Sequence, residues 1–356
     1  MINIFSFIFA KSEPEQKTNF WKIRIIILAL FFASGAVGLI YQIVWNRMLT
    51  LVFGSTVFAT TTVLTAYMAG LALGSFYFGR LSDKRKDHLK IYAYLEGGIG
   101  IYALILPFIL MGVNFIYVAI HRSLNASFYP MSFIRFILCF LVLVIPTTLM
   151  GGTLPVISKA LTDRINKLGW TVGMLYSVNT FGAFVGCFFA GFMLIRTLGM
   201  QTTTFIACGI NILIAIIIIF FLAGKVSSIN NDDLEITKTN ETPQESLDLP
   251  KNAGKIALWV FGISGFCALA YEVLWTRILV MFLGSTAYAF ATMLSSFLLG
   301  IAIGSIIFAK VSDKRKELFI ALGIIQIIIA LSAILLIPVY GKLYDIGLKF
   351  QGKGWL

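Results

Sequence analysis

Two acidic residues stand inside long apolar stretches, where an ionised carboxylate is costly. The chain has sixteen aspartates and glutamates, and only Glu96 and Glu272 fall within runs long enough to cross a lipid bilayer. A charge at the centre of a membrane costs about 3 kcal/mol on insertion scales, so such residues are kept for a partner or a task. The chemistry that they predict is the binding of a cation or the uptake and release of a proton.

The chain offers little for metal chemistry or for nucleic-acid binding. It has two histidines, and its four cysteines lie in apolar runs without the spacing of metal ligands. The net charge of +12 comes from short basic clusters between apolar runs, which is not a nucleic-acid-binding pattern. The sequence therefore predicts no metal site, no cofactor, no catalytic residues and no nucleic-acid partner.

Aromatic side chains lie beside Glu272, and the same arrangement surrounds a glutamine earlier in the chain. The residues are Tyr41, Gln42, Trp45, Tyr271, Glu272 and Trp275. Carboxylates and aromatic faces together bind organic cations, so this stripe is a candidate site for a small cation such as a polyamine. Two other interpretations stay open: the acid is neutral or paired with Arg47 or Arg277 near the outer surface, or the aromatics form a belt there.

Further polar and helix-breaking residues lie in other apolar runs. Asn179 is a candidate for substrate binding, although an amide there more often makes an interhelical hydrogen bond. Pro146 removes a backbone donor and frees a carbonyl deep in its run, which makes it a candidate hinge. Glycines at 70 and 74, and again at 300 and 304, form G-x-x-x-G pairs that allow two helices to approach closely.

The elements that must position these residues are membrane-spanning helices. Charged residues make up 12% of the chain and its mean hydropathy is +0.91, which excludes a water-soluble enzyme as the interpretation of the whole chain. About 20 apolar residues span a bilayer as a helix. Nine stretches of that length are predicted, near 25–48, 56–79, 91–117, 132–158, 170–195, 202–224, 255–278, 286–309 and 317–340.

The distribution of basic residues predicts the orientation of these helices. With the N-terminus in the cytoplasm, twenty of the 28 Lys and Arg residues fall on the inner side of the cell membrane. The chain then divides into an inner segment (1–24), a six-helix bundle (25–224), a polar inner linker (225–254), three helices of a second bundle (255–340) and a tail (341–356).

The second bundle repeats the first at a constant offset of 230 residues. The run ASGAVGLIYQIVWNRMLTLVFGST from Ala33 corresponds without a gap to ISGFCALAYEVLWTRILVMFLGST from Ile263. Both copies start on the same side, so they form a parallel repeat. Glu272 aligns with Gln42 and Glu96 aligns with Gln326. Each half thus has one carboxylate and one amide, and the four side chains could line one cavity if the halves face each other across a pseudo-twofold axis. Their predicted depths differ, since Glu96 lies about six residues from the inner end of its span and Glu272 about six residues from the outer end of its span.

Each copy ends its second span with a basic loop that contains an aspartate. The loops are GRLSDKRKD at 79–87, with Asp83 and Arg85, and AKVSDKRKE at 309–317, with Asp313 and Arg315. An aspartate at a helix end can pair with basic neighbours and latch two helices together. A similar loop, G-x-x-x-D-R-x-G-R-R, occurs in major-facilitator proteins. The alternative interpretation is a solvated basic loop that only sets orientation.

The sequence resembles the membrane part of the fused major-facilitator/spermidine synthase family. The resemblance is carried by the run from Ser34 to Lys86, by PTTLMGGTLPVISKAL at 146–161 and by YSVNTFGAFVGCFFAGFMLIRTLG at 176–199. It implies an all-α, major-facilitator-like membrane fold followed by a soluble aminopropyltransferase domain. The present sequence shows no such domain and stops three spans short of two six-helix halves, so we expect a truncated chain or a natural nine-span protein and carry over no enzyme activity.

Three functions are compatible with these features. The first is a transporter-like module that binds or moves a small organic cation such as a polyamine. The second is a membrane anchor or regulatory domain for an aminopropyltransferase, fused or separate, with no transport of its own. The third is a transporter of another small solute, because one membrane architecture hosts many substrates.

Overall fold

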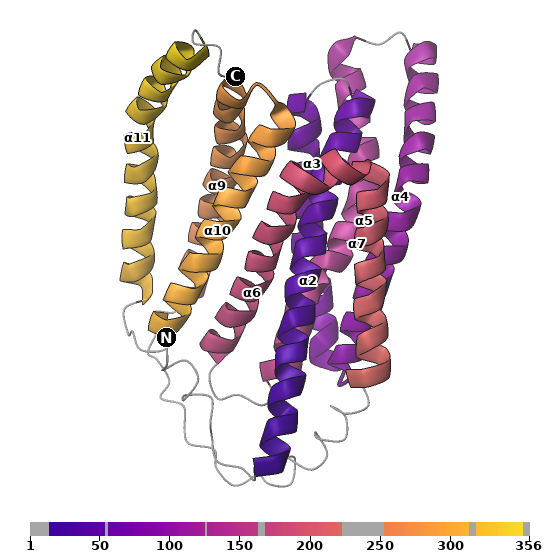
Figure 1. The fold of residues 1–356 in the computed structure, drawn as a ribbon, viewed down its shortest axis with the longest axis vertical. Coiled ribbons are helices and arrows are strands. Elements are labelled where there is room, and N and C mark those ends of the chain that lie inside the picture. The colour runs from indigo at the N-terminus through magenta and orange to yellow at the C-terminus, as the bar shows by residue number, and fades with distance from the viewer. Residues whose placement is uncertain are drawn as a thin grey trace.

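The computed structural model describes residues 14–53, 56–124, 127–162, 168–222, 253–312 and 318–351. These ranges are helical apart from short links between helices, and they contain no strand. The helices are α2 (Pro14–Phe53), α3 (Thr56–Lys84), α4 (His88–Leu124), α5 (Phe128–Thr162), α6 (Leu168–Phe189), α7 (Ile195–Ile217), α9 (Ala253–Leu283), α10 (Thr286–Ser312) and α11 (Leu318–Gln351) (Figure 1). Two π-helical turns, η1 (Ala190–Leu194) and η2 (Ile218–Leu222), follow α6 and α7.

Eight helical segments in the described ranges are long and apolar enough to cross a membrane. One of them, Thr171–Leu222, has 52 residues and contains two of the predicted spans. It breaks at Gly199, where φ is 79° and ψ is 169°, a conformation that glycine adopts without strain. The chain turns back there, so that α6 and α7 run in opposite directions (Figure 1). The predicted all-helical, multi-pass membrane fold is confirmed.

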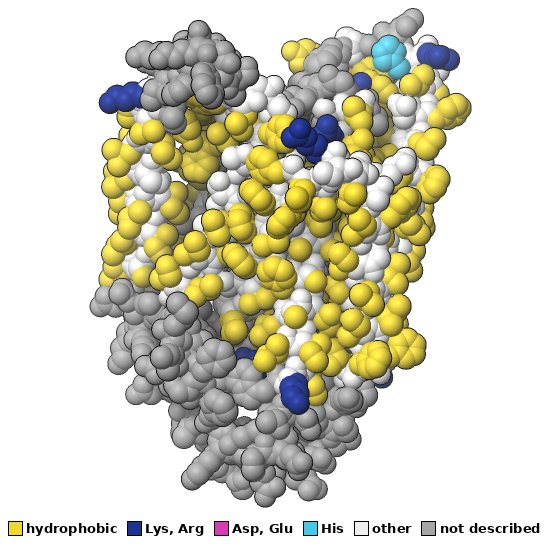
Figure 2. Space-filling model, viewed as in Figure 1, with side chains coloured by type: hydrophobic (Ala, Val, Ile, Leu, Met, Phe, Trp, Pro, Cys, Tyr) yellow, Lys and Arg dark blue, Asp and Glu magenta, His cyan; other side chains and the backbone are white. Residues whose placement is uncertain are grey.

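The outer surface of the bundle has the character of a surface that faces lipid. Hydrophobic side chains cover the middle of the molecule, and lysines and arginines lie toward its two ends (Figure 2). Large apolar residues such as Phe108 and Phe115 are more than two-thirds exposed. In water such a surface would drive aggregation, whereas in a bilayer it is the expected solvent contact.

The structure reproduces the parallel repeat. Helices α2 and α9 run in the same direction, as do α3 and α10, and α4 and α11 (Figure 1). A hydrogen bond recurs at equivalent positions: Ser34 Oγ donates to Glu96 Oε1 at 2.5 Å, and Gln326 Nε2 donates to Ser264 Oγ at 2.9 Å. Residues that are equivalent at the offset of 230 therefore make equivalent contacts between helices.

Backbone contact through small residues holds the first half together. On α3, a Cβ added at Gly74 would overlap the backbone carbonyl of Thr148 on α5. On α6, a Cβ added at Gly182 or Gly186 would overlap carbonyl oxygens of α2. Since lipid gives apolar helices no hydrophobic reason to associate, this close packing supplies much of the attraction between them.

Helix α6 also joins the first half to the second. It runs along α10, with Ser177 Oγ donating to the carbonyl of Ala302 at 2.9 Å and Cys187 Sγ lying 3.7 Å from the carbonyl of Ala291. Gly191 of η1 continues this contact, since a Cβ there would overlap the side chain of Ala291. We call this α6–α10 contact the seam between the halves.

The equivalent glycines of the two halves predict opposite effects of one substitution. Gly74→Ala should lower the midpoint of thermal unfolding, because overpacking of a close contact costs about 1–3 kcal/mol. Gly304→Ala should leave the midpoint unchanged or raise it slightly, because no described atom lies within 4 Å of a Cβ placed there. The measurement is thermal unfolding of both purified variants in the same detergent. Equal loss of stability in both would contradict the packing described.

Candidate functional site

Glu96 lies inside the first bundle and both of its carboxylate oxygens have hydrogen-bond donors. It is fully buried on α4. Ser34 of α2 donates to Oε1, and Asn211 Nδ2 of α7 donates to Oε2 at 2.9 Å. Tyr92, one turn earlier, is also buried and packs edge-on against Phe31 of α2. The carboxyl group thus ties three helices of one bundle together.

Glu272 has a different environment. It is 2% exposed on α9, and its Oε1 has no hydrogen-bond partner among the described residues. Helix α9 packs against α10, and α10 in turn forms the seam with α6. No lysine or arginine in the described ranges forms an ion pair with Glu272. A buried carboxyl group with a free oxygen therefore stands next to the seam between the halves.

The hydrogen bonds of one aligned pair of positions lie within each half, and the expectation that the two acids and two amides line one cavity stays a prediction. Glu96 and Gln326 each bond to the serine of their own half, so both face the interior of their own bundle. Gln42 is 2% exposed like its counterpart Glu272, and its Nε2 likewise has no partner among the described residues. At the aligned positions 96 and 326 the side chains are thus hydrogen-bonded. At positions 42 and 272 each side chain has a polar atom without a described partner.

The aromatic residues form stacked pairs in both halves. The rings of Tyr41 and Trp45 lie 5.1 Å apart at 13°, and those of Tyr271 and Trp275 lie 5.4 Å apart at 19°. Tyr41 and Trp45 are fully buried, which excludes a surface belt for that pair. Tyr271 and Trp275 are partly buried and lie within one turn of Glu272.

Asn179 and Pro146 both take part in contacts between helices. The backbone and side-chain oxygens of Asn179 on α6 lie so close to Gly35 of α2 that a Cβ there would overlap them. Helix α5 continues through Pro146, and Tyr102 of α4 donates its hydroxyl to the carbonyl of Val142 at 2.8 Å. That carbonyl is the one that the proline leaves without its helical donor. The site predicted as a hinge is thus bonded across the helix contact.

The inner loop of the first copy contains an ion pair between helices. Asp83 at the end of α3 binds Lys159 of α5 at 2.7 Å, and both side chains are largely exposed. Arg85, the predicted neighbour, is exposed in the link to α4. Asp313 and Arg315, the predicted latch residues of the second copy, lie outside the described residues.

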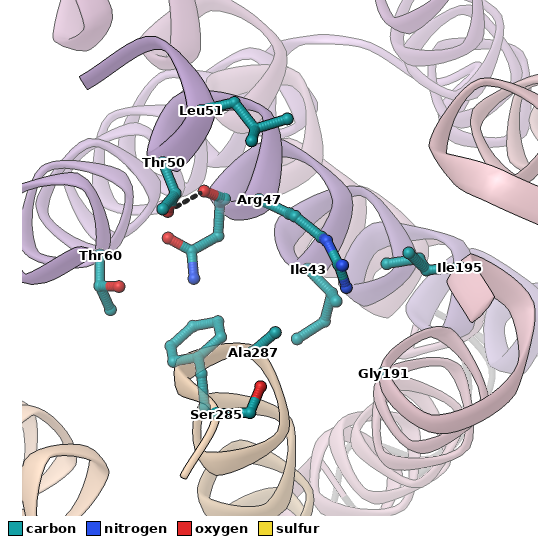
Figure 3. Close-up of a pocket in the computed structure, with 11 residues that line it drawn as sticks. Ile43, Arg47, Thr50, Leu51, Thr60, Gly191, Ile195, Ser285 and Ala287 are labelled. Atoms are coloured by element: carbon teal, nitrogen blue, oxygen red, sulfur yellow. Dashed lines mark hydrogen bonds between the residues drawn. The ribbon is translucent and has the colours of Figure 1, made fainter. Parts of the chain in front are cut away.

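A pocket of about 200 Å³ lies where the end of α2 meets the α9–α10 turn (Figure 3). Its polar lining consists of Asn46, Arg47, Thr50, Thr60 and Ser285. The sequence predicted Arg47 as a possible ion-pair partner of the acid near the outer surface, not as part of a pocket. In the sequence, this pocket is indicated only by the polar residues at 46, 47 and 50 and by the Ser285-Thr286 pair. The pattern of neighbouring residues does not show that these two segments lie close together.

The family model of the Major Facilitator Superfamily matches residues 26–348. The chain belongs to this superfamily. The match covers both copies of the repeat, and together with the apolar helices it identifies a major facilitator-type transporter that crosses the membrane several times. No curated protein and no solved structure matches the chain in the corresponding comparisons.

The bond between Tyr102 and the carbonyl of Val142 can be tested by a double substitution. Tyr102→Phe should destabilise this major facilitator protein by about 1 kcal/mol, because a buried carbonyl loses its donor. Adding Pro146→Ala should restore most of the loss, because alanine supplies the missing helical N–H group. The measurement is thermal unfolding, with Tyr94→Phe on the exposed face of α4 as the control. Additive effects of the two substitutions would exclude the coupling.

Proposed function

We propose that this protein moves a small organic cation, such as a polyamine, across the membrane and that Glu272 binds the cation. The observation that supports this is the buried Glu272 oxygen without a partner beside the seam. Transporters built from repeats hold their substrates near the middle of the membrane, where the repeats meet. The seam between α6 and α10 is where the two halves of this protein meet.

The energetics favour an ionic task for Glu272 over a structural one. Glu96 shows what a structural acid looks like in this protein, since its two oxygens are occupied by Ser34 and Asn211. Among the described residues Glu272 Oε1 has no donor, so the charged form of the buried Glu272 is stabilised less well than that of Glu96. A cation that binds there supplies the missing partner, and this gain adds to its affinity.

The aromatic pair on α9 adds a second kind of cation contact. Tyr271 and Trp275 stack on each other within one turn of Glu272. A ring face attracts an ammonium group by about 0.5–2 kcal/mol, more when the site is dry. The equivalent pair in the first half accompanies the neutral Gln42, so the second half carries the charge of the proposed site.

The choice of a polyamine rests on the sequence resemblance to the spermidine synthase-fused family. The same resemblance is the basis for proposing an aminopropyltransferase, fused or separate, as a partner. The orientation proposed is an N-terminus in the cytoplasm of the cell, which follows from the twenty basic residues assigned to the inner side. The role proposed for Glu272 does not depend on the polyamine, on the aminopropyltransferase partner or on the orientation.

Uptake of labelled spermidine into proteoliposomes tests the proposal. Glu272→Gln gives α9 the residue that α2 has at the same place, and it removes the charge with little change in shape. Uptake should fall by about tenfold or more, since each 1.4 kcal/mol of lost binding is a factor of ten. Asp87→Asn removes a carboxylate from an exposed surface pair and should leave uptake unchanged.

Two outcomes would contradict the proposal. If wild-type vesicles accumulate no spermidine above empty vesicles, the polyamine assignment is wrong. If Glu96→Gln abolishes uptake while Glu272→Gln leaves it intact, the cation is bound by the other carboxylate. Both variants are first checked for a wild-type unfolding midpoint, so that lost uptake reports on binding.

A further inference from the structure

The pocket at the end of α2 is built from both halves of the protein. Its wall on one side comes from α2, with Asn46, Arg47 and Thr50. On the facing side, Ser285 and Ala287 come from the start of α10 (Figure 3). We infer that this pocket binds an oxyanion, a carboxylate or a phosphate group, which bridges the two halves at this end of the molecule.

Arg47 supplies the charge. Its guanidinium group extends into the pocket between Ile43 and Ile195 (Figure 3). It forms no hydrogen bond or ion pair with any residue that the structure describes, and none of the described lining residues is acidic. A guanidinium fork matches the paired oxygens of a carboxylate or phosphate, and it binds them in a bidentate manner.

Asn46 is a second, independent sign of a ligand. It is 7% exposed, it lines the pocket, and its buried Oδ1 has no partner among the residues that the structure describes. Its side-chain amide makes no hydrogen bond to a described residue, although its backbone carbonyl accepts one from Thr50 Oγ1 at 2.8 Å. A buried amide without partners is unfavourable unless a ligand or water completes its bonds. Oδ1 only accepts hydrogen bonds and cannot bind an anion, so the group that Asn46 offers to an anion is its NH₂ donor.

The start of α10 contributes a positive end. The amide of Ala289 donates to the carbonyl of Ser285 at 3.0 Å, so the helix begins directly after Ser285. The first N–H groups of a helix have no partner within it, and together they favour an anion. Since Ser285 and Ala287 both line the pocket, this helix end lies at the site together with the Ser285 hydroxyl.

An anion in this pocket has a conformational consequence. It would be held by Arg47 of the first half and by the α10 end of the second half, so it stabilises the arrangement in which these ends are close together. A ligand shifts an equilibrium toward the state that it binds better. The site is distinct from Glu272, and its occupancy can be measured without any transport assay.

The test uses the purified full chain in detergent and inorganic phosphate as the probe. At constant ionic strength, phosphate should raise the unfolding midpoint of the wild type in a saturable way. Arg47→Gln should weaken the apparent affinity by about tenfold or more, because it removes the charged donor. Arg277→Gln is the matched control: it is the same residue at the equivalent place in the repeat, it does not line the pocket, and it should respond like the wild type.

A second variant and a second probe complete the design. Ser285→Ala changes the side of the pocket that the second half contributes, and it should also weaken the rise of the unfolding midpoint with phosphate. The unfolding midpoint of this variant without phosphate shows whether it is folded. Soluble short-chain phosphatidic acid distinguishes the sources, since a stronger response to it than to phosphate identifies a lipid headgroup and the reverse identifies a free anion. A response to neither probe, or one that Arg47→Gln leaves unchanged, overturns the inference.

Discussion

Backbone-to-backbone contact between helices is the constraint on which the rest of this structure depends. In lipid, apolar side chains gain nothing by leaving their solvent, so helices associate where small residues let them approach closely. Gly74 lies against the Thr148 carbonyl, and Gly182 and Gly186 lie against carbonyls of α2. These contacts fix the positions of α2, α3, α5 and α6, and through α6 they fix where the second half is attached.

Polar groups are placed within this framework according to whether their bonds are completed. Ser34 and Asn211 donate to the two carboxylate oxygens of Glu96 and so join three helices. Tyr102 completes the carbonyl that Pro146 leaves free. Glu272 and Asn46 belong to a larger set of residues with a buried polar atom that has no partner among the described residues, which also includes Tyr41, Gln42 and Asn211. Glu272 is the one carboxyl group in that set, and a bound cation or water would complete its bonds.

The sequence predicted the helices and the repeat because both are written in local patterns. An apolar run of about 20 residues in a bilayer has no alternative to a helix. It did not predict the glycine turn at 199, which joins two of the spans in a continuous helical segment, or the two π-helical turns.

The sequence predicted less well which side chains meet between the helices. The rotation of each helix about its axis decides which residues meet, and a helix that is apolar all round gives little sign of it. The aligned serines at 34 and 264 and the Glu/Gln pair at 96 and 326 carried the information for one contact. Asn211 lies in a segment without a second copy in this chain, and Arg47 meets Ser285 only because distant parts of the chain come together.

The recurring serine bond explains how two halves of common origin came to differ in charge. A hydroxyl group both donates and accepts, so Ser34 serves a carboxylate while Ser264 serves an amide. Glutamate and glutamine can therefore replace each other at this position without loss of the hydrogen bond to the serine. The two halves therefore keep the same contact between helices while they differ in the ionisable group that makes it.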